Sequence, residues 1–218
     1  MALRTREPLT KERILETAVR IMDQEGLEAV TMRRLGRDLG VEAMSLYNHV
    51  EDKEDLFHGM IETVMREFVL PEDSVGRWED RVRILARSYR TVLRNHPEVI
   101  QLFAEHEKPM TDAASLRPIE TSLEALRASG LPDEEVAEAY KMFSGYIMGF
   151  VMQETRGVFA AEHAGISEID ASFPADALPN LAQLFPILCG ASHTDDDFDF
   201  GIEVMIDGLR DRLKGRRR

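Results

Sequence analysis

Residues 31–50 read TMRRLGRDLGVEAMSLYNHV. The stretch predicts two helices of about eight residues joined by a tight turn at Gly40, where a left-handed backbone favours glycine. Two such helices with small and polar residues on the outer side of the second are typical of a helix-turn-helix, whose second helix enters the major groove of DNA. Apolar residues recur at the spacing that would pack the pair onto a preceding helix: Leu35, Leu39, Val41, Leu46 and Val50.

The second helix of the pair, expected from about Glu42 to His49, presents side chains suited to DNA. Asparagine can read adenine through two hydrogen bonds, and serine or tyrosine hydroxyls can bind phosphate. Arg33 suits guanine O6 and N7, Thr31 offers a hydroxyl and free helix amides to a phosphate, and Lys53 adds a further phosphate contact. The residues expected on or near the outer side are Glu42, Ala43, Met44, Ser45, Tyr47, Asn48 and His49.

Spacing alone leaves DNA binding open. A short helix pair with a glycine turn also occurs in proteins that do not bind DNA. Taken singly, Tyr47 is more typical of half-buried packing, and His49 of a capping or solvent-facing histidine.

The rest of the chain reads as helix after helix, with no alternation of apolar and polar residues long enough for a strand. Thr10 can cap the first helix, Gly26 can end it, and Asp52 can cap a longer fourth helix reaching about Val69. The fold class is therefore all-α, with a three-helix helix-turn-helix domain at residues 1–52 and a larger helical domain at residues 53–218. Further helices are expected at about residues 77–95, 97–104, 113–129, 133–158, 180–188 and 196–214, with a loop at 160–179.

Composition narrows the class of protein. The 218 residues carry a formal net charge of −13, yet residues 1–50 hold eight basic and eight acidic side chains. An acidic body behind a neutral end would favour docking of that end on DNA. Cys189, the single cysteine, excludes an internal disulfide and suits a buried position in a reducing cytoplasm. Neither a signal peptide nor an apolar run of about 18 residues is seen, so no membrane partner is expected.

The sequence contains none of the residue patterns that are typical of enzyme active sites. There is no Glu-x-x-His pair, nucleophile elbow, phosphate loop or Cys/His cluster, so no catalytic residue, cofactor or metal is expected. The acidic run near residue 195 lacks the glycine-containing loop and closing glutamate of a calcium site, and instead suits the start of the last helix. A helical-bundle enzyme and a ligand-independent architectural DNA-binding protein remain the alternatives.

The segments TMRRLGRDLGV (31–41), SLYNHV (45–50) and KEDLF (53–57) resemble the N-terminal DNA-binding domain of the tetracycline-repressor (TetR) family. The resemblance extends over about residues 10–60. It implies that one set of side chains sits over bases and a second set holds phosphates. The first set is Arg33, Ala43, Met44, Ser45 and Asn48, and the second is Thr31, Tyr47, His49 and Lys53.

The sequence departs from the family pattern at three places. Gly36 stands where alanine is common, which weakens the helix slightly. Met44 replaces a proline or serine and would make an apolar contact. Negative charge gathers beside the DNA-binding residues and would limit non-specific affinity, at Glu51, Asp52, Glu54 and Asp55.

The remainder resembles, more loosely, the regulatory and dimerisation domain of the same family. A homodimer is expected because one short recognition helix reads too few bases alone. Two apolar helices, at about residues 133–158 and 196–214, are expected to form the dimer interface, where Gly145 and Gly149 would let a second helix approach closely. The alternative for both helices is an ordinary core within one chain. The apolar positions are Val136, Ala139, Tyr140, Met142, Phe143, Tyr146, Ile147, Phe150 and Val151 in one helix, and Ile202, Met205, Ile206, Leu209 and Leu213 in the last.

The resemblance further implies a cytoplasmic repressor that leaves a palindromic operator when a small molecule binds the body. His106 can anchor a polar group of that molecule, or a metal accompanying it, although a lone histidine is more often simply solvated. Each apolar candidate is also a candidate for ordinary core packing. The expected pocket residues are Met65, Phe68, Leu102, Phe103, His106, Phe143, Ile147 and Phe150.

Overall fold

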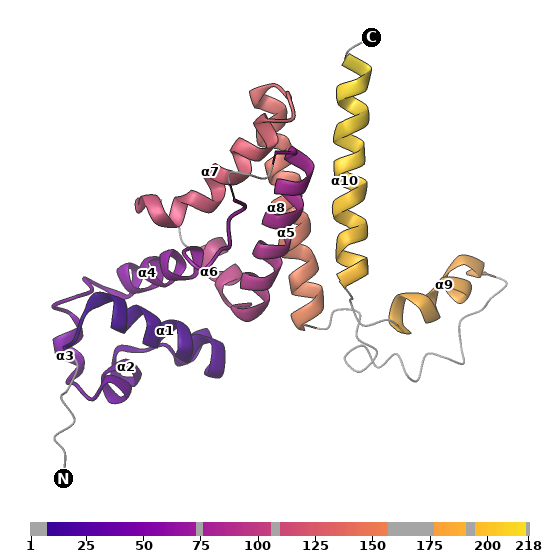
Figure 1. The fold of residues 1–218 in the computed structure, drawn as a ribbon. Coiled ribbons are helices and arrows are strands. Elements are labelled where there is room, and N and C mark those ends of the chain that lie inside the picture. The colour runs from indigo at the N-terminus through magenta and orange to yellow at the C-terminus, as the bar shows by residue number, and fades with distance from the viewer. Residues whose placement is uncertain (1–7, 73–75, 106–109, 157–176, 191–194, 217–218) are drawn as a thin grey trace. The chain divides into compact units, whose positions relative to one another are not determined.

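The computed structural model describes residues 8–72, 76–105, 110–156, 177–190 and 195–216. These residues form ten α-helices and no strand, which confirms the all-α class (Figure 1). No helix in the described ranges is long and apolar enough to cross a bilayer. In chain order they are α1 (Lys11–Glu25), the short 3-10 helix η1 (Leu27–Ala29), α2 (Met32–Leu39), α3 (Ala43–Leu46), α4 (Lys53–Met65), α5 (Trp78–Asn95), α6 (Val99–Glu105), α7 (Ala113–Arg127), α8 (Asp133–Arg156), α9 (Pro179–Gly190) and α10 (Asp195–Arg216).

The chain divides into two compact units. Unit 1 comprises residues 1–70 and 91–121, and unit 2 comprises residues 71–90 and 122–218. The predicted helix-turn-helix lies in unit 1, and α5 contributes residues to both units. The domain boundary at residue 52 stays a prediction.

Helix starts and ends in unit 1 follow from local chemistry. The Thr10 hydroxyl accepts a hydrogen bond from the amide of Arg13 at 3.2 Å, and the Thr31 hydroxyl accepts one from the amide of Arg34 at 3.1 Å. Each bond satisfies one of the amides left free at a helix start. Gly40 ends α2 with φ of 67°, a left-handed conformation that a side chain would disfavour.

The core of unit 1 holds the DNA-binding helices together. α1 packs against α2 and α4, and α4 packs against α6. Burial of one large aliphatic side chain contributes about 1.5–3 kcal/mol, so these contacts fix the helix pair in place. The side chains with no more than 1% exposure include Ile14, Ile21, Met22, Val30, Leu35, Leu46, Leu56 and Met60.

Two helices end earlier than the sequence predicts. α3 stops at Leu46, and the chain continues in turns in which the amides of His49 and Val50 both bond to the carbonyl of Leu46. The tight turns bring Val50 into the core, where it is 1% exposed. α4 ends at Met65 rather than near Val69, whose side chain is exposed and adds nothing to a buried face.

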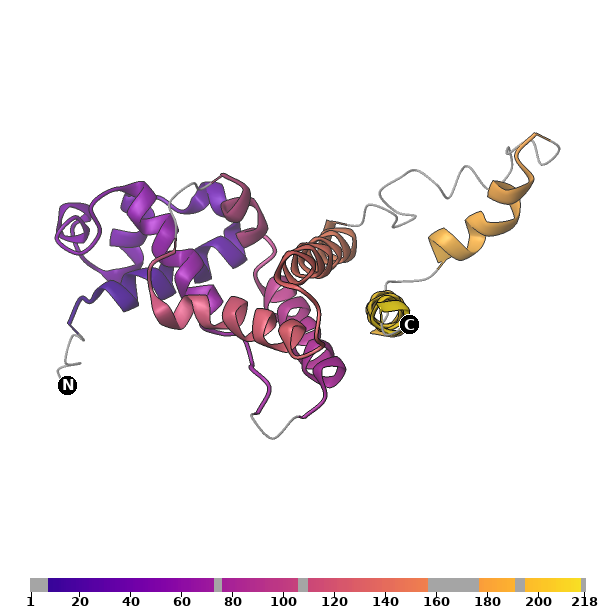
Figure 2. The ribbon, with the colours of Figure 1, turned by 90° about the horizontal axis from the view of Figure 1, so that it is seen from above.

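An aromatic cluster joins α8 to α10 in unit 2. The Phe198 ring packs against those of Tyr146 and Phe150, with centroid distances of 5.7 and 5.2 Å, and the Tyr146 hydroxyl donates to the carbonyl of Phe198 at 3.0 Å. A Cβ atom at position 201 would collide with the Tyr146 hydroxyl and ring, so any larger residue there would have to displace the Tyr146 side chain. Figure 2, which views α8 and α10 close to end-on, shows the two helices running alongside each other.

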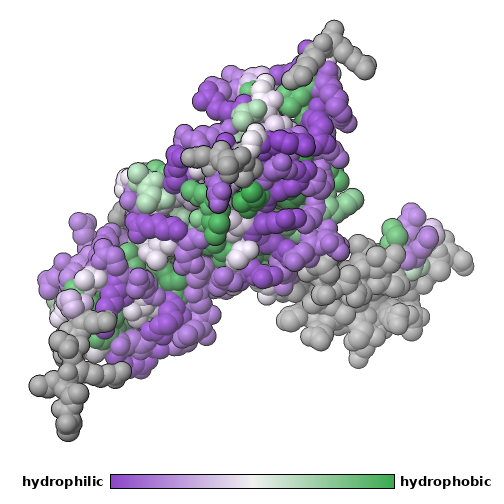
Figure 3. All heavy atoms as spheres, in the orientation of Figure 1, coloured by the Kyte–Doolittle hydropathy of each residue, from purple (hydrophilic) through white to green (hydrophobic). Residues whose placement is uncertain are grey.

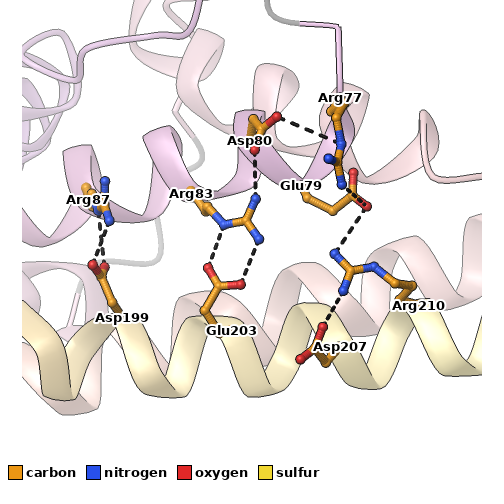
Figure 4. Close-up of polar contacts among 9 residues, drawn as sticks. All are labelled: Arg77, Glu79, Asp80, Arg83, Arg87, Asp199, Glu203, Asp207 and Arg210. Carbon is orange, nitrogen blue, oxygen red and sulfur yellow. Dashed lines mark hydrogen bonds and ion pairs between the residues drawn. The ribbon is translucent and has the colours of Figure 1, made fainter.

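Ion pairs join α10 to α5 along their lengths (Figure 4). Arg83 and Arg87 of α5 each bond with two nitrogens to a carboxylate of α10, those of Glu203 and Asp199. Arg210 of α10 reaches back to Glu79 of α5 at 3.4 Å. The molecular face in Figure 3 is mostly hydrophilic, with hydrophobic residues between the hydrophilic ones. This side of the helix pair is held by charge in addition to apolar contact.

Candidate nucleic-acid interface and ligand cavity

The close approach of α2 and α3 depends on Gly36. A Cβ atom at this buried position would lie 2.9 Å from the carbonyl oxygen of Val41 and 3.2 Å from the amide nitrogen of Ala43. Both are backbone atoms at the turn between the helices, so any larger residue must move the turn. The absence of a side chain at Gly36 therefore compensates for its lower helix propensity.

The structure leaves the predicted recognition residues accessible on unit 1. Met44 is 75% exposed and Tyr47 is 47% exposed. The packing alternative for Tyr47 therefore accounts for only part of its surface. Of the other candidates, Thr31, Arg33, Asn48 and Lys53 are exposed, and Ala43, Ser45 and His49 are half-buried.

Two hollows on the surface of unit 1 connect several of these residues. One is bordered by Gly36, Arg37, Val41 and Ser45, and the other by Thr31, Arg33 and Arg37. Arg37 borders both hollows, although it is not among the residues predicted from the sequence. Its signal was the spacing of four residues from Arg33, which places both cations on one side of α2.

Several cations near the helix pair are already neutralised. Arg34 bonds to Glu25 and Asp38, and its hydrogen bond to Glu25 is the main reason that the pKa of that carboxyl is lowered. Lys11 pairs with Asp55 at 3.0 Å. Within the described residues, no ion pair is found for Arg33 or Arg37. Together with Lys53, for which the described residues show a contact with the Phe57 ring but no ion pair, these two guanidinium groups are the cations best placed to meet an external anion.

The acidic residues beside the helix pair have internal roles. The Asp52 carboxylate accepts a hydrogen bond from the amide of Asp55 at 2.7 Å, which caps α4. Asp55 accepts from the amide of Glu51 at 3.0 Å and also pairs with Lys11. Part of the predicted negative charge therefore holds the start of α4 in place.

A separate cavity lies inside unit 2, between α5, α7 and α8. It offers about 30 Å³ of space to the centres of water-sized molecules, and it is partly open to solvent. The lining is apolar apart from four hydroxyl groups, and none of its residues carries a charge. The lining residues are Val82, Leu85, Ala86, Tyr89, Ser122, Leu126, Tyr140, Phe143, Ser144 and Ile147.

The tyrosine hydroxyls of the cavity remain protonated at neutral pH. Burial raises the pKa of Tyr89 and, as the largest cause, also that of Tyr140. The hydroxyl of Ser122 lies close enough to that of Tyr89 to influence its ionisation. A ligand entering the cavity would therefore meet neutral hydrogen-bond donors in apolar surroundings.

The structure distributes the predicted pocket residues over different places. Phe143 and Ile147 line the cavity, whereas Phe150 belongs to the aromatic cluster of α8 and α10. Met65, Phe68 and Leu102 are buried in unit 1, Phe103 is half-buried there, and His106 lies outside the described residues. The difference arises because an apolar period marks a buried face without showing which helices cover it.

Tyr89, Ser122, Tyr140 and Ser144 line the cavity but were not selected from the sequence. Tyr140 and Ser144 share a face of α8 with Phe143 and Ile147, at helical spacing. The positions of Tyr140 and Ser144 in the sequence could have indicated hydroxyl groups along the apolar face of α8. No sequence pattern indicated that this face packs against α5 and α7.

Comparison with known proteins assigns both parts of the chain. Residues 14–60 match the family of bacterial regulatory proteins, tetR family, and residues 70–213 match the tetracyclin repressor-like C-terminal domain. The HTH-type transcriptional repressor DrrR1 of Streptomyces coeruleorubidus is 31% identical over 220 residues, which is 96% of this chain and 80% of the relative.

Solved structures agree with this assignment. ActR of Streptomyces coelicolor in complex with actinorhodin is 31% identical, with a TM-score of 0.76 over 94% of this chain and 99% of that chain. The same protein in complex with (S)-DNPA is 32% identical, with a TM-score of 0.77 over 96% and 98% of the two chains. The chain belongs to the TetR family and is a DNA-binding transcriptional regulator, not an enzyme.

Proposed function

We propose that this protein is a homodimeric cytoplasmic repressor that binds a palindromic DNA operator through α2 and α3 of each subunit. A small, largely apolar molecule entering the cavity of unit 2 releases it from the operator. The observation that carries the proposal is the apolar cavity in one unit together with exposed recognition side chains in the other. An architectural DNA-binding protein without a ligand would have no use for such a cavity.

In the proposed DNA contacts, two groups of side chains have different tasks. Arg33, Ala43, Met44, Ser45 and Asn48 face bases, and Thr31, Tyr47, His49 and Lys53 bind phosphates. Arg37 joins the second group because it is an exposed cation beside Ser45. Base contacts supply sequence specificity, and phosphate contacts supply affinity that falls with salt. Duplex DNA from beside the gene of this protein, titrated at several salt concentrations, is the direct test, and a flat salt dependence would contradict phosphate binding.

The cavity favours an uncharged effector. A charged ligand would lose its hydration without gaining a counter-ion, because none of the lining residues is charged. Neutral aromatic molecules with oxygen acceptors suit both the apolar walls and the tyrosine hydroxyls. Actinorhodin and (S)-DNPA are suitable first probes, because ActR was crystallised in complex with each of them.

Removing one hydroxyl from the cavity tests this assignment. We expect Tyr89→Phe to weaken the binding of a cavity ligand by about 5-fold, because one hydrogen bond contributes about 1 kcal/mol. Operator binding without ligand should stay unchanged. Fluorescence titration with actinorhodin measures the first quantity, and DNA mobility shift measures the second.

Tyr146→Phe is the matched control, since it also removes a tyrosine hydroxyl. The Tyr146 hydroxyl bonds to the carbonyl of Phe198, and Tyr146 is not among the residues that line the cavity. Equal effects of the two variants on ligand affinity would contradict a site in this cavity.

The proposed dimer surface is an apolar stripe on α8 and α10. The structure buries Ile202 and Ile206 inside unit 2, so the intrachain alternative accounts for these predicted interface residues. The exposed apolar residues are instead Met142 and Met152 on α8 and Phe200 and Val204 on α10, at 41%, 39%, 71% and 54% exposure. A Cβ atom at Gly145, Gly149 or Gly208 would meet nothing within 4 Å, which leaves room for a second helix pair.

A charge placed on this stripe should separate the subunits. We expect Phe200→Asp to convert a dimer to a monomer at micromolar concentration and to weaken operator binding by at least about 10-fold, because two linked heads are needed for two half-sites. Analytical ultracentrifugation gives the mass. Val69→Asp, which changes an equally exposed apolar residue in unit 1, should leave the mass unaltered. A dimeric Phe200→Asp protein would contradict the assigned surface.

A further inference from the structure

His96 lies between two carboxylates in unit 1. Its Nδ1 atom is 2.9 Å from Oδ2 of Asp23, and its Nε2 atom is 2.9 Å from Oε2 of Glu67. Asp23 belongs to the last turns of α1, Glu67 follows the end of α4, and His96 follows the end of α5. One imidazole ring thus connects the ends of three helices that are far apart in the sequence.

The geometry favours the protonated ring. Both partners are hydrogen-bond acceptors, and only an imidazolium can donate from both nitrogens at once. The hydrogen bond to Asp23, followed by that to Glu67, raises the pKa of His96 against the opposing effect of burial. The carboxylates occupy opposite edges of the ring, and no cluster suited to a metal ion is found among the described residues.

Among the described residues that border the hollow beside His96, Arg20 is the one other cation. The hollow beside His96 is bordered by Glu16, Arg20 and Asp23 of α1 and by Thr63 and Glu67 from the α4 side. Arg20 is engaged with Asp38 at 2.9 Å. Along the sequence, the charged residues nearest to His96 are Arg94 and Glu98, which carry opposite charges. Loss of the ring proton would leave the carboxylates of Glu16, Asp23 and Glu67 beside a neutral imidazole, while Arg20 stays paired with Asp38.

α1 carries the core on which the DNA-reading helices rest. It packs against α2 and α4 and buries Ile14, Ile21 and Met22 completely. A constraint on the end of α1 is therefore transmitted to α2, because close-packed interiors transmit strain.

We propose that His96 is a positioning residue for DNA binding, whose imidazolium clasps the end of α1 to the end of α4 and releases it when the ring loses its proton. The inference rests on the proposed operator binding, to which it adds a control by pH. A group whose pKa is raised on folding contributes stability that is complete below its unfolded value, near 6.5, and is lost as pH rises through the folded value. The clasp should therefore loosen from neutral toward alkaline pH.

The first test needs no DNA. Hydrogen-exchange protection of the α1 amides near Asp23 is compared between wild type and His96→Gln at about pH 6 and about pH 9, after correction for intrinsic exchange. Glutamine keeps one donor but cannot gain a proton. We expect protection in the variant to be about 10-fold lower at the acidic pH and nearly equal to wild type at the alkaline pH.

His58→Gln provides the matched control, because it removes another histidine of unit 1, one that pairs with Glu62 of its own helix α4 at 3.3 Å. An NMR titration should place the pKa of His96 above 6.5 in the wild type and bring it down in Asp23→Asn. Equal loss of protection at both pH values, or a titration at or below 6.5, would overturn the clasp.

The second test measures operator affinity of the same proteins over the same pH range. We expect His96→Gln to bind about 5-fold more weakly than wild type at about pH 6 and within about 2-fold at about pH 9. A pH-independent ratio would overturn the positioning role. If wild type itself bound no duplex, the proposed function would fail, whereas the exchange experiment would still decide whether the clasp exists.

Discussion

Replacing Arg33 and Tyr47 together with alanine should weaken operator binding by at least about 30-fold, with little change in the stability of the protein. Arg33 is exposed and has no ion pair within the described residues, and Tyr47 is 47% exposed, so neither contributes much to the core. Each lost base or phosphate contact costs about 1–3 kcal/mol of binding free energy, and two such losses combine to the expected factor.

The measurement is a fluorescence-anisotropy titration of labelled operator DNA at two or more salt concentrations. Loss of a phosphate contact should lower the slope of log affinity against log salt by about 1, whereas loss of a base contact leaves the slope nearly unchanged. Arg127→Ala is the control, because it removes one exposed cation from the end of α7, in unit 2. Equal weakening by the control would show that net charge, not these two positions, governs binding.

Replacing Arg90 with leucine should destabilise unit 2 by about 3 kcal/mol, the typical consequence of leaving one member of a buried ion pair unpaired. The Arg90 side chain is 8% exposed and bonds through two nitrogens to Glu154, itself 14% exposed. Its guanidinium also lies 5.2 and 4.9 Å from the ring centres of Phe150 and Phe198 and bonds to Asp195 at 2.7 Å. The side chain therefore holds α5, α8 and α10 together at one point.

Urea unfolding followed by circular dichroism measures the loss. Arg87→Leu is the matched control, since Arg87 also lies on α5 and pairs with α10, but its side chain is 63% exposed. Exposed ion pairs contribute about 1 kcal/mol or less, so the control should unfold near the wild-type midpoint. The double variant Arg90→Leu, Glu154→Leu should recover part of the stability because no buried charge remains unpaired. Equal destabilisation by both single variants would contradict the role given to burial.

The cavity was only partly accessible to prediction. Phe143 and Ile147 appear in the predicted pocket because they lie on the apolar face of a helix that the sequence locates well. Met65 and Leu102 have the same kind of signal but belong to the core of unit 1. Periodicity shows that a face is buried, and the partner helix across it depends on packing between distant segments.

The amino-acid sequence by itself determined the helices, the caps at Thr10, Thr31 and Asp52, the left-handed turn at Gly40 and, through residues 31–57, the family. These features depend on residues within a few positions of one another, where backbone hydrogen bonding and side-chain period act directly.

Only the tertiary structure decided which helices enclose the cavity, why position 36 is glycine, and which charges meet inside the protein. Asp23 and His96 are 73 positions apart, and Arg90 and Glu154 are 64 apart. Such pairs form only after the helices have packed, because a charge selects its partner by distance in space and by loss of water. No local pattern in the chain records that choice.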